Sequence, residues 1–170
     1  DHVEERTLSI GLPRAREKGL QLLLDLSPDL PEAVMLDAER LQQVLSNLIG
    51  NSLKFTDRGE ICLSIRSRAR SSDGRVRVNF SVRDSGLGLN AAQLGALFQP
   101  FNRLGQESSA IEGTGIGLVI SRSLVELMGD DFDFSALTEV DDTVRGEILA
   151  ELPAEPVAEG VRELASDDAV

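Results

Sequence analysis

The clearest helix signal in this 170-residue chain is the segment AERLQQVLSNLIGNSLKF, residues 38–55. Its apolar side chains recur at i, i+3, i+4 and i+7 spacing, which places them on one stripe of a helix: Leu41, Val44, Leu45 and Leu48. Asp37 immediately precedes the segment and is a good N-cap residue. A helix with one apolar stripe must bury that stripe against another layer, so we expect a layered fold around residues 38–55.

Segments that alternate between apolar and polar residues lie on both sides of this helix. Upstream, the alternation predicts a strand over residues 20–26, and a continuous apolar run predicts a short strand over 34–36. Downstream, it predicts a hairpin built from 61–65 and 76–82. The rest of the pattern predicts a short helix at 91–98, a second long helix at 114–128, and strands near 131–138 and 145–152. The predicted fold class is α+β: a two-layer sandwich with helices on one face of a mixed, largely antiparallel sheet.

Composition and charge exclude several classes of protein. The formal net charge is −12, which argues against nucleic-acid binding because phosphate contacts require clustered Lys and Arg. No apolar run approaches the roughly 20 residues that span a bilayer, so we expect no direct membrane contact. Cys62 is the only cysteine, which rules out an internal disulfide and a multi-cysteine zinc site. We expect a cytoplasmic location, with membrane anchoring of a parent protein left open.

Three polar residues share one edge of the first long helix. Asn47, Asn51 and Lys54 are separated by four and three residues, so they lie close together beside the apolar stripe. A solvated helix edge is the simple interpretation. However, Asn is unfavourable in a helix interior, and its carbonyl oxygen can bind a hard cation. Asn51 as a Mg²⁺ ligand and Lys54 as a phosphate partner therefore form a coherent alternative.

Two glycine-containing segments are candidate ligand sites. Asp84-Ser85-Gly86-Leu87-Gly88 follows a predicted strand, where a carboxylate could accept a hydrogen bond from an exocyclic amine; a plain turn is the alternative. Gly113-Thr114-Gly115-Ile116-Gly117-Leu118 opens the helix at 114–128. Glycine-rich backbone at a helix N-terminus offers free N–H groups to phosphates, although a flexible loop has the same composition.

Together these segments resemble the ATP-binding domain of sensor histidine kinases. Residues 47–56 (NLIGNSLKFT) resemble the family's N box, 84–88 (DSGLG) its first glycine box, 97–101 (LFQPF) its F box, and 113–118 (GTGIGL) its second glycine box. The order and spacing agree over roughly residues 15–153. The resemblance implies the Bergerat ATP-binding sandwich of the GHKL superfamily, with ATP and Mg²⁺ as ligands.

The resemblance also implies roles for the matching residues. Asn51 would hold Mg²⁺, Asn47 and Lys54 would face the phosphates, and Asp84 would bind the adenine amino group. The expected contributors to the catalytic and ATP-binding site are Asn47, Asn51, Lys54, Asp84, Gly86, Gly88, Phe98, Phe101, Arg103, Gly113, Thr114, Gly115, Ile116, Gly117 and Leu118. Residues 89–112 would form a mobile ATP lid, with Phe98 and Phe101 as anchors and Arg103 directed at a phosphate.

One position separates kinases from hydrolases within this superfamily. The gyrase-like and Hsp90-like members carry a Glu one helical turn before the Mg²⁺-binding Asn, where it activates water. This chain has Asn47 there, and a carboxamide is not a general base near neutral pH. The resemblance therefore implies a protein-histidine kinase that transfers the γ-phosphoryl group of ATP to a histidine.

The phosphoacceptor histidine is expected outside this chain. His2 lacks the His-Glu-x-x-Thr/Ser-Pro setting, and Asp1 rather than Met begins the chain, so we expect a fragment of a longer protein. We expect residues 1–14 to be a linker from a dimerisation domain, 15–153 the catalytic domain, and 154–170 an acidic tail or linker. The expected partners are the histidine-bearing dimerisation domain of the same protein and a downstream response regulator or receiver domain. The isolated domain is expected to be monomeric.

Two alternatives remain open from sequence. A degenerate, non-catalytic docking module could use the same fold, since Asp130 stands where the family usually has a second glycine and residues 143–148 depart from its usual Gly-Ser/Thr-Thr-Phe stretch. A serine kinase of the same superfold is the other.

The acidic residues are unevenly distributed along the chain: residues 130–170 contain 13 of the 29 acidic residues but only two arginines. The nearly neutral remainder is compatible with binding a polyanionic nucleotide.

Overall fold

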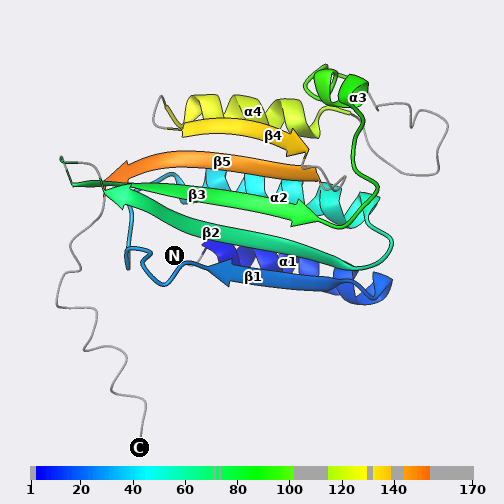
Figure 1. The fold of residues 1–170 in the computed structure, drawn as a ribbon, viewed down its shortest axis with the longest axis horizontal. Coiled ribbons are helices and arrows are strands. Elements are labelled where there is room, and N and C mark those ends of the chain that lie inside the picture. Colours follow the sequence, from blue (N-terminus) through cyan, green and yellow to red (C-terminus); the bar gives the residue numbers. More distant parts are fainter. Residues whose placement is uncertain are drawn as a thin grey trace, which may run out of the picture.

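The computed structural model describes residues 3–70, 72, 74–101, 115–129, 132–138 and 144–153, with the backbone alone for 68–70, 132–138 and 144–153. The elements in chain order are α1 (Val3–Lys18), β1 (Gln21–Leu26), α2 (Ala38–Phe55), β2 (Glu60–Arg70), β3 (Arg75–Asp84), α3 (Ala91–Gly95), α4 (Gly117–Leu127), β4 (Phe132–Thr138) and β5 (Val144–Pro153). Their arrangement is drawn in Figure 1.

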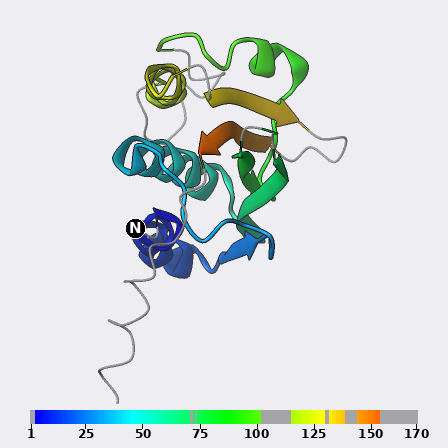
Figure 2. The same cartoon turned by 90° about the vertical axis from the view of Figure 1, so that its left-hand side faces the viewer.

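The strands form one five-stranded sheet in the order β1-β2-β3-β5-β4. β1 and β2 are parallel, with Leu22 opposite Ile61, whereas the other three pairs of neighbours are antiparallel. Figure 2 shows α1, α2 and α4 stacked in one layer on one side of the sheet. The predicted α+β sandwich, with helices on one face of a mixed and largely antiparallel sheet, is confirmed.

α2 is the central helix and begins and ends where the sequence predicts. The Asp37 carboxylate accepts a hydrogen bond from the Arg40 backbone N–H at 3.1 Å, and the Thr56 N–H donates to the Ser52 carbonyl at 3.0 Å. Its apolar stripe is almost completely buried, and burial of a single leucine side chain contributes about 1.5–3 kcal/mol. The buried residues of α2 are Leu41, Val44, Leu45, Leu48, Ile49, Ser52 and Leu53.

α1 packs against α2, along a stripe of residues spaced four apart. The buried residues of this stripe are Val3, Thr7, Gly11 and Ala15. A Cβ atom on Gly11 would lie 3.0 Å from the Ile49 Cγ2 atom, so the absence of a side chain permits the close approach of the helices. The expected domain boundary between residues 14 and 15 thus falls inside one continuous helix.

Other element bounds differ modestly from prediction. The predicted strand over residues 34–36 is wrong: only Val34 forms an isolated bridge, and its neighbours up to the Asp37 cap have bend or loop backbone. The short helix ends at Gly95 rather than 98, and the second long helix begins at Gly117 rather than 114. Within the part of the chain that the structure describes, no helix combines the length and the apolar character needed to cross a membrane.

Candidate functional site

The polar edge of α2 faces the start of α4. The Asn47 side-chain amide donates a hydrogen bond of 2.7 Å to the Ser121 hydroxyl, which is buried. A Cβ atom on Gly117 would lie 2.6 Å from the Asn47 Oδ1 atom. The structure therefore brings the polar edge of α2 into contact with the glycine-rich segment, although the two are about 70 residues apart in the sequence.

Asn51 and Lys54 lie further along α2, and both are half-buried. The Lys54 ammonium group is 4.7 Å from the centroid of the Phe55 ring. No group of three or more His, Cys, Asp or Glu residues that could hold a metal occurs among the described residues. Mg²⁺ does not need one, because it keeps several waters and binds substrate phosphates with only one or two protein groups, usually carboxylates, although an amide carbonyl is also an oxygen donor. The Asn51 side-chain oxygen fits that requirement.

Asp84 and Gly86 form a close-packed corner at the end of β3. Asp84 is 8% exposed, and its Oδ1 atom accepts a hydrogen bond of 2.9 Å from the Gly86 N–H. A Cβ atom on Gly86 would lie 2.7 Å from the Phe55 carbonyl oxygen, 2.8 Å from Asp84 Oδ1 and 3.0 Å from Thr56 Oγ1. Only glycine fits here without displacing backbone, and the corner presents a buried carboxylate beside it.

The other described glycines of segments 84–88 and 113–118 have left-handed backbone conformations. Gly88 has a φ of 67° and Gly115 a φ of 72°, which side chains disfavour. Ile116 is the N-cap of α4 and makes no side-chain capping hydrogen bond. The first turn of α4, which includes the half-buried Leu118, thus has no side-chain cap within the described part of the chain.

The expected lid residues are placed only in part. Phe98 contacts α4 through Arg122, whose guanidinium carbon is 5.1 Å from the ring centroid. Phe101 is 77% exposed and has a φ of 61°. Arg103, Gly113 and Thr114 fall outside the described residues.

Comparison with known proteins identifies the family. Residues 36–155 match the family described as histidine kinase-, DNA gyrase B-, and HSP90-like ATPase. The chain belongs to this ATPase family. The matched range includes every described candidate residue from Asn47 to Leu118.

Relatives of this ATPase domain include named sensor kinases. It is 44% identical over 117 residues to the virulence sensor protein BvgS of Bordetella pertussis, covering 68% of this chain and 9% of that protein. It is 40% identical over 121 residues to the signal transduction histidine-protein kinase BarA of Escherichia coli, covering 71% of this chain and 13% of that protein. The chain therefore spans only about a tenth of these relatives.

Solved histidine kinase structures share the fold of this ATPase domain. Full-length ShkA, crystallised in complex with AMPPNP, superposes with a TM-score of 0.73 at 28% identity over 91% of this chain and 30% of that one. The nucleotide-free catalytic domain of the histidine kinase ThkA gives a TM-score of 0.70 at 21% identity, covering 88% of this chain and 90% of that one. The fold is that of histidine kinase catalytic domains.

Thr56 belongs to the corner at Gly86 and was missed by the sequence analysis. Its side chain is fully buried, and within the described residues its hydroxyl has no hydrogen-bond partner. A buried hydroxyl without a partner is costly, and an ordered water is the usual partner of such a group. In the sequence, however, Thr56 looks like an ordinary residue at a helix C-terminus.

Proposed function

We propose that this chain is the ATP-binding catalytic domain of a two-component sensor histidine kinase. It binds Mg-ATP and transfers the γ-phosphoryl group to a histidine on a separate dimerisation domain. The family membership and the named sensor kinases among its relatives support this proposal. The single observation that carries nucleotide binding is the corner formed by Asp84, Gly86 and Thr56.

This corner has the chemistry required for the adenine end of ATP. The Asp84 carboxylate accepts a hydrogen bond from the exocyclic amino group, and the free lone pairs of a buried carboxylate favour such a donor. Gly86 allows the base to approach the backbone, and the Thr56 hydroxyl supplies a further donor and acceptor. The AMPPNP bound in the related structure of ShkA supports a nucleotide ligand.

At the phosphate end, the chain supplies positive charge and N–H donors. Asn51 holds Mg²⁺, which when bound neutralises the developing charge on the phosphates. Lys54 faces the same phosphates, together with Asn47 and the first turn of α4. The proposal assigns the phosphate cradle to Gly113, Gly115 and Gly117 with Thr114, Ile116 and Leu118, and a phosphate contact to Arg103; of these residues the structure describes Gly115, Ile116, Gly117 and Leu118.

Asn47 favours transfer to an incoming nucleophile over hydrolysis. Its carboxamide donates to Ser121 and accepts no proton near neutral pH, so it does not activate water. Phosphoryl transfer depends mainly on positioning and charge neutralisation. The nucleophile is then an imidazole delivered by the dimerisation domain.

The proposed partners follow from this chemistry. The domain acts on a histidine-bearing dimerisation domain of the same protein, and a response regulator or receiver domain takes the phosphoryl group onward. A cytoplasmic location gives access to ATP and to the response regulator. The domain alone is proposed to be a monomer.

Isothermal titration with AMPPNP and Mg²⁺ tests nucleotide binding. Wild type should bind, and Asp84→Asn should weaken binding at least about ten-fold, because the amide presents a donor to the adenine amino group. Asp25→Asn is the matched control, since Asp25 lies on β1, where it pairs with Arg66 of β2, and its replacement should leave the affinity unchanged. No binding by wild type, or undiminished binding by Asp84→Asn, would overturn the proposal.

The transfer step is tested separately with a polypeptide that carries a phosphoacceptor histidine. Incubation with ATP and Mg²⁺ should yield an acid-labile phosphorylated product. An acid-stable product would indicate a serine kinase instead. Nucleotide binding without any phosphorylation would indicate a non-catalytic module.

A further inference from the structure

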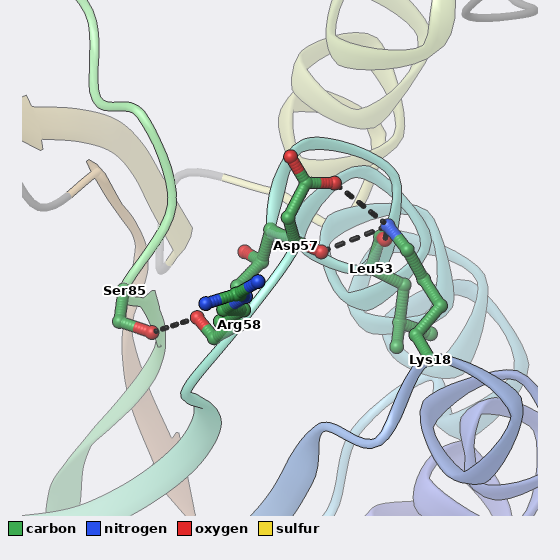
Figure 3. Close-up of polar contacts among 6 residues, drawn as sticks. Lys18, Leu53, Asp57, Arg58 and Ser85 are labelled. Atoms are coloured by element: carbon green, nitrogen blue, oxygen red, sulfur yellow. Dashed lines mark hydrogen bonds and ion pairs between the residues drawn. The ribbon is translucent and has the colours of Figure 1, made fainter.

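Lys18, the last residue of α1, reaches the C-terminal end of α2. Its ammonium group donates hydrogen bonds to the Leu53 carbonyl at 2.7 Å and to the Thr56 carbonyl at 2.8 Å. Figure 3 shows the side chain extending across to this end of α2. Carbonyl groups at a helix C-terminus carry partial negative charge and lack intrahelical partners, so a cation is well suited to them.

The Asp57 carboxylate contributes little to this arrangement. Its Oδ1 atom is 3.8 Å from the Lys18 ammonium, and its side chain is 87% exposed. An exposed ion pair of this kind is screened by solvent and contributes little to stability. The two backbone carbonyls are therefore the main partners of Lys18.

The carbonyls held by Lys18 belong to the same corner as Gly86. Thr56 offers its carbonyl oxygen to Lys18, while its hydroxyl lies 3.0 Å from the position of a Gly86 Cβ atom. The Phe55 carbonyl, between the two that Lys18 holds, lies 2.7 Å from that position. A shift of this end of α2 would therefore change the space beside Gly86 and Asp84.

Ser85 holds the other side of the turn that follows α2. Its hydroxyl accepts a hydrogen bond of 3.0 Å from the Glu60 N–H and donates to the Arg58 carbonyl at 3.2 Å. Its backbone N–H donates to the Glu60 carbonyl at 3.1 Å. The turn is thus held from two sides, by Ser85 and by Lys18 (Figure 3).

We propose that Lys18 is a positioning residue for the adenine end of the nucleotide site. By holding the Leu53 and Thr56 carbonyls, it fixes the end of α2 against Gly86 and Asp84, so that the corner is formed before the base enters. This inference rests on the proposed function of the site. It gives α1 a role in ligand binding, although α1 itself does not contact the ligand.

Lys18→Met tests the proposal, since it keeps most of the side-chain length and removes the ammonium. The matched control is Arg40→Met, because the Arg40 guanidinium similarly donates to the Leu127 carbonyl at the C-terminus of α4, at 3.0 Å. Dissociation constants for adenosine and for AMPPNP with Mg²⁺ are measured on the full chain at a temperature where all variants are folded. Lys18→Met should raise both constants by a similar factor, roughly five- to ten-fold, whereas Arg40→Met should change them less than about two-fold.

Two further measurements separate positioning from a general loss of stability. Lys18→Arg restores a cation and should recover part of the affinity. In the ligand-free chain, amide NMR signals of Thr56 and Gly86 should shift in Lys18→Met and not in Arg40→Met. Affinities that fall equally in both Met variants, or that are unchanged in Lys18→Met, would overturn the positioning role alone. Absence of nucleotide binding by wild type would instead overturn the proposed function and, with it, this inference.

Discussion

At the residue scale, two glycines of the candidate site lie against single oxygen atoms of α2. At Gly86 and at Gly117, a Cβ atom would lie 2.7 Å or less from an oxygen atom of α2. These two glycines come from segments about 30 residues apart, yet both press against the same helix. The tolerance of the site to substitution therefore depends on contact distances and not on helix or turn propensity.

We predict that Gly86→Ala weakens nucleotide binding. The added Cβ would meet the Phe55 carbonyl at 2.7 Å, so backbone must move, at an overpacking cost of about 1–3 kcal/mol. Thermal unfolding and titration with AMPPNP should both register the change. Gly50→Ala is the control: no atom lies within 4 Å of its Cβ position, and alanine favours the helix by about 1 kcal/mol. Equal losses in the two variants would contradict the steric explanation.

We also predict that Ser121→Ala loosens the junction of α2 with α4. The substitution removes the acceptor of the Asn47 amide at a buried position, which should lower the free energy of unfolding by about 1 kcal/mol or somewhat more. Urea unfolding measures this change. Ser123→Ala, an exposed position on the same helix, should be nearly neutral. A neutral Ser121→Ala would mean that the hydrogen bond does not contribute to stability.

Some residues of the corner formed by Asp84, Gly86 and Thr56 could be predicted from the sequence, and others could not. Asp84 and Gly86 were candidates because DSGLG resembles the first glycine box of the sensor kinases; the residues alone were also compatible with a plain turn. Thr56 and Lys18 were missed, because a threonine after a helix and a lysine near a helix end are ordinary in sequence. Their importance arises from tertiary contacts, since Lys18 and Thr56 are 38 residues apart in the chain.

At the scale of elements, the strength of the hydrophobic pattern decided what could be predicted. α2 has a continuous apolar stripe and a capping residue, and its predicted bounds of 38–55 agree with Ala38–Phe55. α1 packs through Thr7, Gly11 and Ala15, which are polar or small, so the sequence shows no apolar stripe there, and residues 1–14 were expected to be a linker. The β2–β3 hairpin alternates clearly and was predicted, whereas the parallel pairing of β1 with β2 required the structure.

The contact between Phe98 and α4 leads to a prediction for α3 and the turn after it. Arg122→Gln removes a guanidinium 5.1 Å from the ring centroid, an interaction of about 0.5–1 kcal/mol at an exposed site. Amide exchange at Leu94 and Ala96, whose N–H groups donate to the Asn90 and Ala92 carbonyls, should accelerate by roughly two- to five-fold.

Glu126→Gln is the matched control for this prediction. Arg122 also forms a 3.3 Å ion pair with Glu126, one helical turn along α4. Glu126→Gln abolishes that ion pair and leaves Arg122 over the ring, so exchange in α3 should stay near the wild-type rate. Acceleration in Glu126→Gln alone would assign the effect to the ion pair rather than to the ring contact.

At the scale of the whole molecule, most of the excess negative charge lies outside the sequence segments that contain the candidate site residues. The formal net charge is −12, yet residues 130–170 contain 13 of the 29 acidic residues and only two arginines. The segments that carry the candidate site therefore come from a nearly neutral part of the chain. Binding a polyanion in such a setting depends on local cations rather than on the total charge.

Mg²⁺ is the cation whose removal tests this dependence. Without Mg²⁺, only hydrogen-bond donors and cations of the protein offset the negative charge of the nucleotide phosphates. Chelation of Mg²⁺ should therefore weaken AMPPNP binding by about ten-fold or more. Adenosine carries no phosphate, and its affinity should not respond to chelation. If the Asn51 oxygen holds the ion, Asn51→Ala should weaken AMPPNP binding in the presence of Mg²⁺ and respond less than wild type to chelation. Each ligand is titrated into wild type and into Asn51→Ala, with and without Mg²⁺. If chelation weakens AMPPNP binding equally in the two proteins, the ion is bound without Asn51.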